Sequence, residues 1–167
     1  DQFILAKNRS HVAAGFDPRP ITAPLFDWQA HVVQWACRTG KAALFEDCGL
    51  GKTLQQLEWA HQVVMETGES VIILTPLAVA HQTENEARKF GIAAKVVASQ
   101  AECQTTGIYI TNYEKIDHFD CSQFVGVVLD ESSILKNFTG KLRRKLTDSF
   151  AQTPYRLCCT ATPSPND

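Results

Sequence analysis

Six short runs of apolar, largely β-branched residues are the feature that most constrains how this chain folds. They occupy residues 42–45, 71–75, 95–98, 108–111, 125–129 and 156–160. Each run is continuous rather than alternating, which is the pattern of strands buried on both faces of a parallel sheet. Segments of helical period accompany them at 28–37, 54–64, 79–90 and 142–150, the last with Thr139 as a candidate N-cap. This rhythm predicts an α/β domain with a mainly parallel central sheet and helices on both faces.

The length and composition of the chain limit the classes of protein that fit it. Its 167 residues suffice for one domain, and a content of 44% hydrophobic and 20% charged residues is ordinary for a globular protein. The formal net charge of −2 excludes a protein that coats nucleic acid through bulk charge. No apolar run approaches the ~18 residues of a membrane span, so we expect no membrane partner.

Cysteine usage and proline placement bear on the compartment and the domain boundaries. None of the six cysteines forms a Cys-x-x-Cys pair, and the adjacent Cys158 and Cys159 lie inside an apolar run, as small hydrophobes do. This favours a reducing, cytoplasmic setting over a disulfide framework or a zinc site. Residues 1–24, with three prolines in "DPRPITAP", predict an irregular lead-in before a domain at 25–167.

A glycine-rich loop, "EDCGLGKT", comes after the first apolar run and precedes a helical segment. In open α/β sheets ligands bind at such places, where a strand end feeds a helix N-terminus. Gly49 and Gly51 let backbone N–H groups converge on phosphate, Lys52 can reach the β and γ phosphates, and the Thr53 hydroxyl can ligate Mg²⁺. Glu46 replaces the leading glycine of the strict phosphate-loop pattern, which weakens the match without removing this chemistry. The alternative is a glycine turn that caps a helix, with a solvated lysine.

An acidic pair, Asp130 and Glu131, comes directly after the apolar run at 125–129. An aspartate at this place can hold the hydration shell of Mg²⁺, and the adjacent glutamate can polarise an attacking water. The alternative is an ordinary acidic loop. We expect this pair and the turn around Gly51 to meet across neighbouring strand tips and to grip a magnesium triphosphate between them.

These two elements and their surroundings resemble superfamily 2 helicase-like ATPases, most closely the Snf2-related branch found in phage and bacterial genomes. The matching motifs run in family order: "LFDWQ", "EDCGLGKT", "ILTPLAVAHQTENEARKF", "ITNYE", "LDESSILKN" and "TATPSPN". That branch has an acidic version of the phosphate loop, which accounts for Glu46. The resemblance implies a RecA-like P-loop NTPase domain that uses ATP and Mg²⁺, with double-stranded DNA as its expected partner.

The resemblance also implies roles for individual residues. Nucleotide binding falls to Gln29, which would read adenine, and to Gly49, Leu50, Gly51, Lys52, Thr53 and Leu54. Catalysis falls to Glu131 and Lys52, and magnesium binding to Thr53 and Asp130. Nucleic-acid contact falls to Thr75, Pro76, Thr111, Asn112, Lys136 and Asn137. Coupling between nucleotide state and nucleic-acid grip falls to Thr160, Ala161 and Thr162.

Two departures from the family pattern matter. Ser133 stands where the family usually has histidine, alanine or aspartate. The sequence also stops soon after the motif at 160–166, whereas in this family ATP lies between two RecA-like lobes and the second lobe supplies arginine fingers. Because such a finger is worth roughly 10³–10⁵ in turnover, we expect a full-length protein with a second lobe and a nearly inactive isolated first lobe.

Other interpretations remain open at this stage. A GTPase would want Asn-Lys-x-Asp, which is absent from the sequence, and a small-molecule kinase would want an arginine-rich lid. A DNA-binding or assembly module with a vestigial nucleotide site, and an enzyme that unwinds RNA or DNA, are further alternatives. The basic residues at 136–145 favour a solvated helix face over nucleic-acid contact. Lys136 is the better candidate for contact, because the family motif would place it near the bound strand. Trp28, Trp35 and Trp59 favour packing over base stacking, with Trp28 also a candidate to flank adenine.

Overall fold

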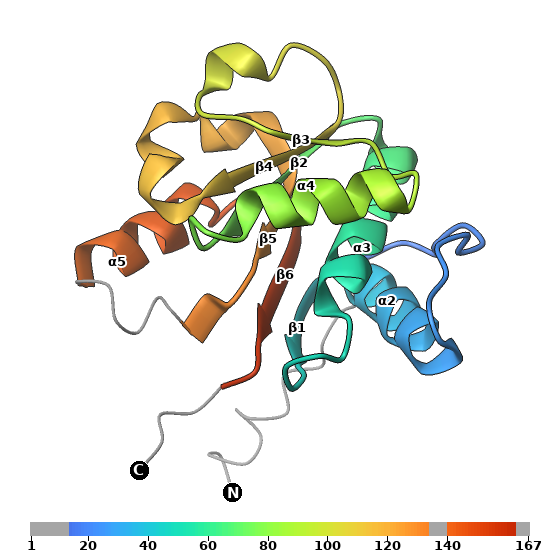
Figure 1. Ribbon diagram of the computed structural model, residues 1–167. Helices are drawn as coiled ribbons and strands as arrows, with labels where there is room; N and C mark the ends of the chain where they lie inside the picture. The colour runs from blue at the N-terminus through green and yellow to red at the C-terminus, as the bar shows by residue number, and fades with distance from the viewer. Residues whose placement is uncertain (1–13, 134–139, 163–167) are drawn as a thin grey trace, which may run out of the picture.

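The computed structural model describes residues 14–133 and 140–162, apart from the side chains of residues 140–142. Within these residues six strands form one parallel sheet in the order β1-β6-β5-β2-β4-β3 (Figure 1). The strands are β1 (Lys41–Phe45), β2 (Ser70–Thr75), β3 (Ala94–Val96), β4 (Ile108–Asn112), β5 (Phe124–Leu129) and β6 (Tyr155–Thr160). The six strands predicted from the sequence and their parallel arrangement are confirmed.

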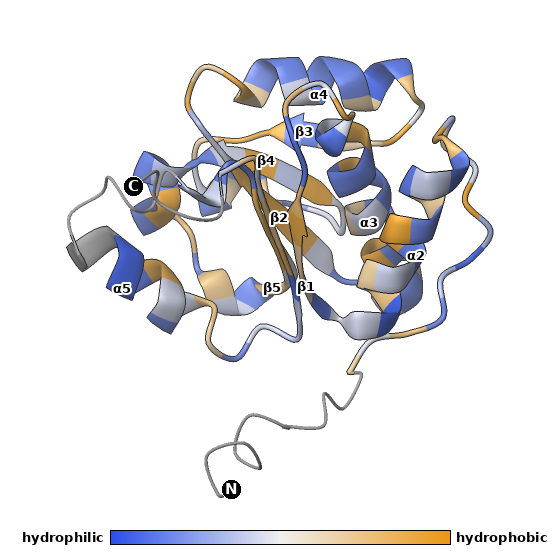
Figure 2. Cartoon of the chain, turned by 90° about the horizontal axis from the view of Figure 1, so that it is seen from below, coloured by the Kyte–Doolittle hydropathy of each residue, from blue (hydrophilic) through white to orange (hydrophobic). Residues whose placement is uncertain are grey.

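Helices cover both faces of the sheet, as predicted. They are α2 (Asp27–Thr39), α3 (Lys52–Thr67), α4 (Ala80–Lys89) and α5 (Gly140–Ser149), with the short 3₁₀ turns η1 (Gln100–Glu102), η2 (Tyr113–His118) and η3 (Cys121–Gln123). Figures 1 and 2 show α2 and α3 on one side of the strands and α5 on the other. The candidate N-cap of α5, Thr139, lies outside the described residues.

Two apolar cores, one on each face, hold these layers together. On one face Leu57 and Val63 of α3 pack against α2, α4 and the sheet. On the other, Leu146 of α5 and Phe150, the residue just after this helix, pack against β5 and η2. In Figure 2 the strands are the most hydrophobic part of the chain. Trp59 is fully buried, whereas Trp28 and Trp35 lie exposed on α2.

Two glycines fix where α3 begins and ends. Gly51, just before the first helical residue, has φ 76°, and Gly68, just after the last, has φ 70° and donates its N–H to the Val64 carbonyl at 2.9 Å. Left-handed backbone is costly for residues with a Cβ, so glycine at both positions sets the length and the start of the helix. The N-terminus of α3 is thereby fixed at the carboxyl edge of the sheet.

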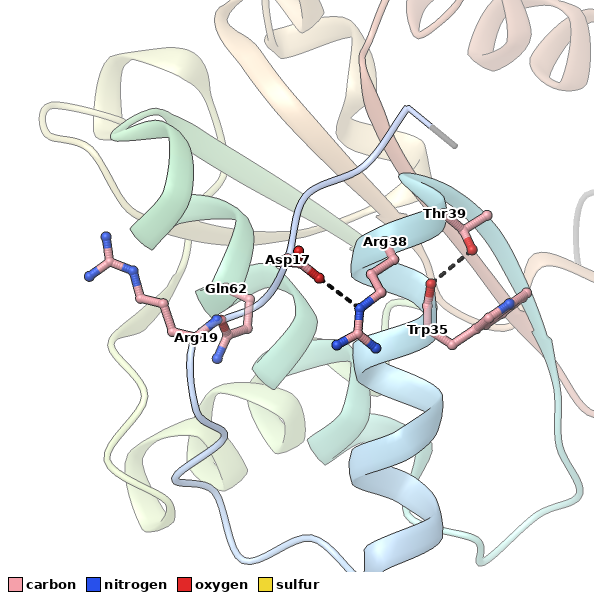
Figure 3. A network of polar contacts seen from close by, with 6 residues as sticks. All are labelled: Asp17, Arg19, Trp35, Arg38, Thr39 and Gln62. Carbon is pink, nitrogen blue, oxygen red and sulfur yellow. Dashed lines mark hydrogen bonds and ion pairs between the residues drawn. The ribbon is translucent and has the colours of Figure 1, made fainter. Parts of the chain in front are cut away.

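The residues before α2 lie against α2 and α3 without forming a helix or strand between residues 14 and 25. The Arg19 N–H donates to Gln62 Oε1 at 2.9 Å, and Arg38 Nε pairs with Asp17 Oδ1 at 2.8 Å (Figure 3). A Cβ at Gly15 would lie only 1.9 Å from the Cys37 carbonyl oxygen, so this segment lies directly on the backbone of α2.

Candidate nucleotide site

The glycine-rich loop joins the end of β1 to the N-terminus of α3. Gly49 has φ 83°, and the place where its Cβ would lie has no atom within 4 Å, so its backbone borders open space. Gly51 is packed differently: a Cβ there would lie 2.6 Å from Gln29 Nε2. The first N–H groups of a helix have no partners inside the helix, and they favour an anion. The loop therefore has the shape and the dipole of a phosphate site.

Two side chains tie the loop to its surroundings. Lys52 Nζ donates to the carbonyl oxygens of Glu46 and Asp47 at 2.8 and 2.9 Å, so the ammonium group lies over the loop rather than in bulk solvent. The Gln29 amide bridges two segments: its Nε2 donates to the Leu50 carbonyl at 2.8 Å, and its Oε1 accepts the Phe26 N–H at 2.9 Å. Gln29, buried at the start of α2, thus holds the loop directly.

The acidic pair lies at the same edge of the sheet, but its strand is not the neighbour of β1. β6 lies between β1 and β5, so the expected meeting across neighbouring strand tips is wrong in this respect. The sequence could not reveal this, because parallel strands are joined by crossovers and sequential order does not fix spatial order. The two halves are joined instead by a side chain of α3: Gln56 Nε2 donates to Asp130 Oδ1 at 2.7 Å.

Asp130 is held on several sides. Its N–H donates to the Leu74 carbonyl at 2.9 Å, and its carbonyl accepts the Tyr113 hydroxyl at 2.7 Å. Burial raises the pKa of the Asp130 carboxyl above its ordinary value, and the hydrogen bond from Gln56 opposes that rise. Burial also raises the pKa of the Tyr113 phenol, which keeps this group protonated as a donor.

Glu131 has a strained backbone and a restrained carboxylate. Its φ of 49° makes it the only non-glycine residue with positive φ in the described part of the chain. Its Oε1 accepts the Ser133 hydroxyl at 2.7 Å and the Thr160 hydroxyl at 3.2 Å. Left-handed φ/ψ in such a residue costs energy and concentrates at functional sites, so this geometry marks Glu131 as a candidate catalytic group.

Two consecutive glutamines of α3 each hold one acid of the site. Gln55 Nε2 donates to Glu46 Oε2 at 2.8 Å, and Gln56 makes the bond to Asp130 described above. Both glutamines are fully buried, and neither Oε1 has a hydrogen-bond partner among the described residues. The acid that replaces the leading glycine of the loop is therefore an anchored part of the site.

A cavity of about 530 Å³ opens beside the loop. The glycine-rich loop and the residues next to it contribute Gly49, Gly51, Lys52, Thr53 and Leu54, and α2 contributes Gln29. An apolar wall comes from Pro24, Phe26 and Phe90. Gln82 and Glu86 line the cavity from α4. Leu54 belongs mainly to the core, whereas Leu50 is exposed and meets Gln29 through its carbonyl.

The residues present fit a magnesium-bound nucleoside triphosphate. Carboxylate and hydroxyl oxygens are the ligands that Mg²⁺ prefers, and Asp130 and Thr53 supply one of each. The Thr53 hydroxyl forms no hydrogen bond with the described residues, and the open space beside Gly49 leaves room for a phosphate. The apolar wall with Phe26 suits the face of a base.

Several residues expected to contact nucleic acid lie inside the protein. The side chains of Thr75, Thr111 and Asn112 are buried, and Asn112 Oδ1 accepts the Glu114 and Lys115 N–H groups as the N-cap of η2. Each stands at the end of a central strand or next to it, and its role in nucleic-acid contact stays a prediction. Pro76 is half-buried in the turn after β2, where Leu77 is exposed. Lys136 and Asn137 lie outside the described residues.

Sequence patterns do not reveal the whole of this site. Gln55 and Gln56 match no motif, although Gln56 lies three residues after Thr53 and therefore shares its helix face. Ser133 stands out in the sequence only as a departure from the family pattern, yet it bonds to Glu131. Gln82 and Glu86, one turn apart on α4, carry no signal that could link them to the loop.

Comparison with solved structures identifies the fold. The SWI2/SNF2 ATPase core of Sulfolobus solfataricus in complex with double-stranded DNA has a TM-score of 0.72 at 25% identity, over 89% of this chain and 34% of that chain. The UvsW helicase of bacteriophage T4 has a TM-score of 0.71 at 14% identity, over 90% and 57%. The Hef helicase domain of Pyrococcus furiosus has a TM-score of 0.67 at 15% identity, over 83% and 34%. The chain thus has the RecA-like α/β fold of superfamily 2 helicase domains, and it spans about a third to somewhat over half of these chains.

The family is shown by the sequence. The SNF2-related domain family model matches residues 28–167, and the chain belongs to that family. No curated protein matches it. Membership of this family, together with the helicase-like fold, supports the ATPase and helicase class. Among the helices of the described residues, none combines the length and apolar character that crossing a membrane requires.

Proposed function

We propose that this chain is the ATP-binding lobe of a Snf2-like motor that couples ATP hydrolysis to movement along double-stranded DNA. The observation that carries the proposal is the 2.7 Å contact between Gln56 and Asp130, which joins the phosphate-loop helix to the acidic pair in one site. Membership of the SNF2-related family and the likeness to an ATPase core solved with double-stranded DNA support the choice of substrate and partner.

In this proposal each part of the site has one task. The N–H groups around Gly51 and the Lys52 ammonium bind the phosphates, and Gln29 and Phe26 border the base. Thr53 and Asp130 hold Mg²⁺, which when bound neutralises charge on the β and γ phosphates. Glu131 orients and polarises the attacking water through the carboxylate that Ser133 and Thr160 restrain.

Lys52 has to leave its present partners when phosphate binds. Its ammonium now lies on the carbonyls of Glu46 and Asp47, and an anion with full negative charge is a stronger partner than two neutral oxygens. Until phosphate binds, the two carbonyls hold the lysine beside the cavity that Gly49 also lines. We propose that a second RecA-like lobe of the full-length protein closes over this edge and supplies the arginine fingers.

Nucleotide binding is the first test, and this chain is sufficient for it. Titration of a fluorescent ATP analogue in Mg²⁺ should show saturable binding, which Lys52→Ala weakens by at least about tenfold, the loss expected from a hydrogen bond to a charged group. Lys41→Ala is the matched control, because Lys41 is exposed at the opposite end of β1. Equal weakening by both substitutions, or no binding at all, would contradict a phosphate site at this loop.

The motor itself has to be tested in the complete two-lobe protein. We expect DNA-stimulated ATP hydrolysis and displacement of a triplex-forming strand, with little separation of a duplex. Glu131→Gln should retain nucleotide binding and abolish turnover, because an amide cannot accept a proton from water. Strand separation without triplex displacement would favour an unwinding helicase, and binding of DNA without any hydrolysis would favour an assembly module.

A further inference from the structure

Gln56 joins the helix that follows the phosphate loop to the acidic pair. The residue lies on α3, where its side chain is only 1% exposed, and its amide nitrogen donates to Asp130 Oδ1 at 2.7 Å. A carboxylate oxygen can only accept, so the amide must present its nitrogen to it. The buried side chain is therefore fixed by its contact with Asp130, just beyond the end of β5.

The bond determines how the Asp130 carboxylate is oriented. Besides Gln56, only the backbone N–H of Glu131 bonds to this carboxylate among the described residues. No ion pair joins Asp130 to a cation there, because Lys52 lies on the carbonyls of its own loop. Within residues 14–133 and 140–162, Gln56 is thus the one side chain that forms a hydrogen bond to this carboxylate.

A neutral amide suits this task better than a cation would. A lysine or arginine at this place would neutralise Asp130 and compete with a metal ion for it. The amide orients the carboxylate and leaves its negative charge available. Partners that orient a metal ligand in this way typically change metal affinity by about 10- to 100-fold when they are removed.

The position of Gln56 on α3 links both expected magnesium ligands. Thr53 lies three residues earlier, so the two side chains project from the same face of one helical turn. That turn begins at the phosphate loop, immediately after Gly51. Any shift of the loop is transmitted through this rigid turn to Thr53 and, through Gln56, to Asp130.

We propose that Gln56 is the positioning residue for Mg²⁺ in this lobe, because it holds the Asp130 carboxylate in register with Thr53 of the same helical turn. The inference rests on the proposed function, since it assumes that the site binds a magnesium nucleotide. It predicts that loss of the amide weakens the contribution of Mg²⁺ to nucleotide affinity and leaves affinity for the free nucleotide nearly unchanged.

The experiment measures the dissociation constant of a fluorescent ATP analogue for this chain, once in Mg²⁺ and once in EDTA. The dissociation constant in EDTA divided by the constant in Mg²⁺ is the magnesium contribution. Gln56→Met keeps the length of the side chain and removes the donor, and it should reduce this ratio about tenfold or more, with the EDTA constant unchanged within about twofold.

A matched control lies on the same helix. Gln62 is also buried and donates to a carboxylate, Glu58 Oε1, at 2.8 Å, but it lies far along α3 from the loop. Gln62→Met should leave both dissociation constants unchanged. Gln56→Leu provides a second variant in case the first does not fold, since it has a similar volume and cannot donate to Asp130. It should also lose most of the magnesium contribution, because nothing then replaces the amide that orients the carboxylate.

A double-mutant cycle separates a positioning role from a general structural one. In the background of Asp130→Asn, which removes the charge, Gln56→Met should change the ratio little. Both residues act on the magnesium contribution to nucleotide affinity, and Gln56 acts only through the Asp130 carboxylate. Equal weakening in Mg²⁺ and EDTA, or an unchanged ratio in Gln56→Met, would overturn the inference. If the unsubstituted chain shows no magnesium contribution, the proposed function fails instead.

Discussion

The Thr160 hydroxyl donates to Glu131 Oε1 at 3.2 Å, so the last residue of β6 restrains a carboxylate located just beyond β5. The same residue reaches the other half of the site, because its carbonyl accepts the Glu46 N–H at 3.2 Å. The Thr162 N–H in turn donates to the Thr160 hydroxyl oxygen at 3.1 Å. Thr160 therefore contacts both the start of the nucleotide loop and Glu131, the candidate catalytic residue.

Thr160→Val should separate turnover from binding. Valine keeps the shape and removes the hydroxyl, so Glu131 loses one of its two hydroxyl partners. We expect nucleotide affinity of this chain to stay within about twofold and turnover of the complete protein to fall about tenfold, the equivalent of a hydrogen bond worth ~1.4 kcal/mol. Thr153→Val is the control, because Thr153 is buried near the start of β6, away from Glu131. A parallel loss in both variants would show a packing effect alone.

Gly51→Ala should abolish nucleotide binding and destabilise the fold. The new methyl group would lie 2.6 Å from Gln29 Nε2, and alanine pays roughly 1–2 kcal/mol in left-handed backbone. Gly68→Ala is a matched control at the other end of α3, with φ 70° and no atom within 4 Å of its Cβ position. Urea unfolding should show a lower free energy of unfolding for both variants. A binding titration should show a loss of nucleotide affinity for Gly51→Ala only. Unimpaired binding by Gly51→Ala would contradict the tight approach of Gln29.

Thiol reactivity should distinguish the loop from the core. Cys48 is exposed in the nucleotide loop and lines the cavity, whereas Cys37 is buried and burial raises the pKa of its thiol to about 12. The thiolate is the reactive form, so at pH 8 about one Cys37 thiol in 10⁴ is reactive even before access is considered. Mass spectrometry after iodoacetamide should find Cys48 alkylated first, and Mg-ATP should slow this reaction. Faster labelling of Cys37 would mean that α2 separates from the sheet.

Gly15→Ala should weaken the fold more than loss of the neighbouring ion pair does. A methyl group at Gly15 would lie 1.9 Å from the Cys37 carbonyl oxygen, and forced displacements of this kind typically cost about 1–3 kcal/mol. The pair of Arg38 and Asp17 is largely exposed, so Asp17→Asn should cost less than about 1 kcal/mol. Chemical denaturation of both variants shows which of them loses more free energy of unfolding. An equal loss would show that the residues before α2 are not packed on that helix.

The architecture was predictable because its signals are local. Continuous apolar runs identified all six strands. The strand order was not predictable, since the placement of β6 between β1 and β5 depends on packing of distant segments. For the same reason the sequence suggested a direct meeting of the loop and the acidic pair, where the structure has Gln56 between them.

The site was predictable only where backbone chemistry requires particular residues. Gly49, Gly51 and Lys52 stand out because few residues can replace them in a phosphate loop. Gln55 and Gln56 look like the polar face of an amphipathic helix, and they are buried only because α2, α4 and the sheet surround α3. Thr75 and Thr111 are also buried, although they are polar, and nothing in the sequence around them indicates this.

The position of β6 has a mechanical consequence. This strand runs between β1 and β5, and its final residue, Thr160, is hydrogen-bonded to Glu46 beyond the end of β1 and to Glu131 beyond the end of β5. We propose that a displacement of the chain that leaves Thr160 changes both contacts together. The start of the nucleotide loop and the orientation of the Glu131 carboxylate would then shift at the same time. Binding of a partner and timing of the reaction would thus depend on one residue.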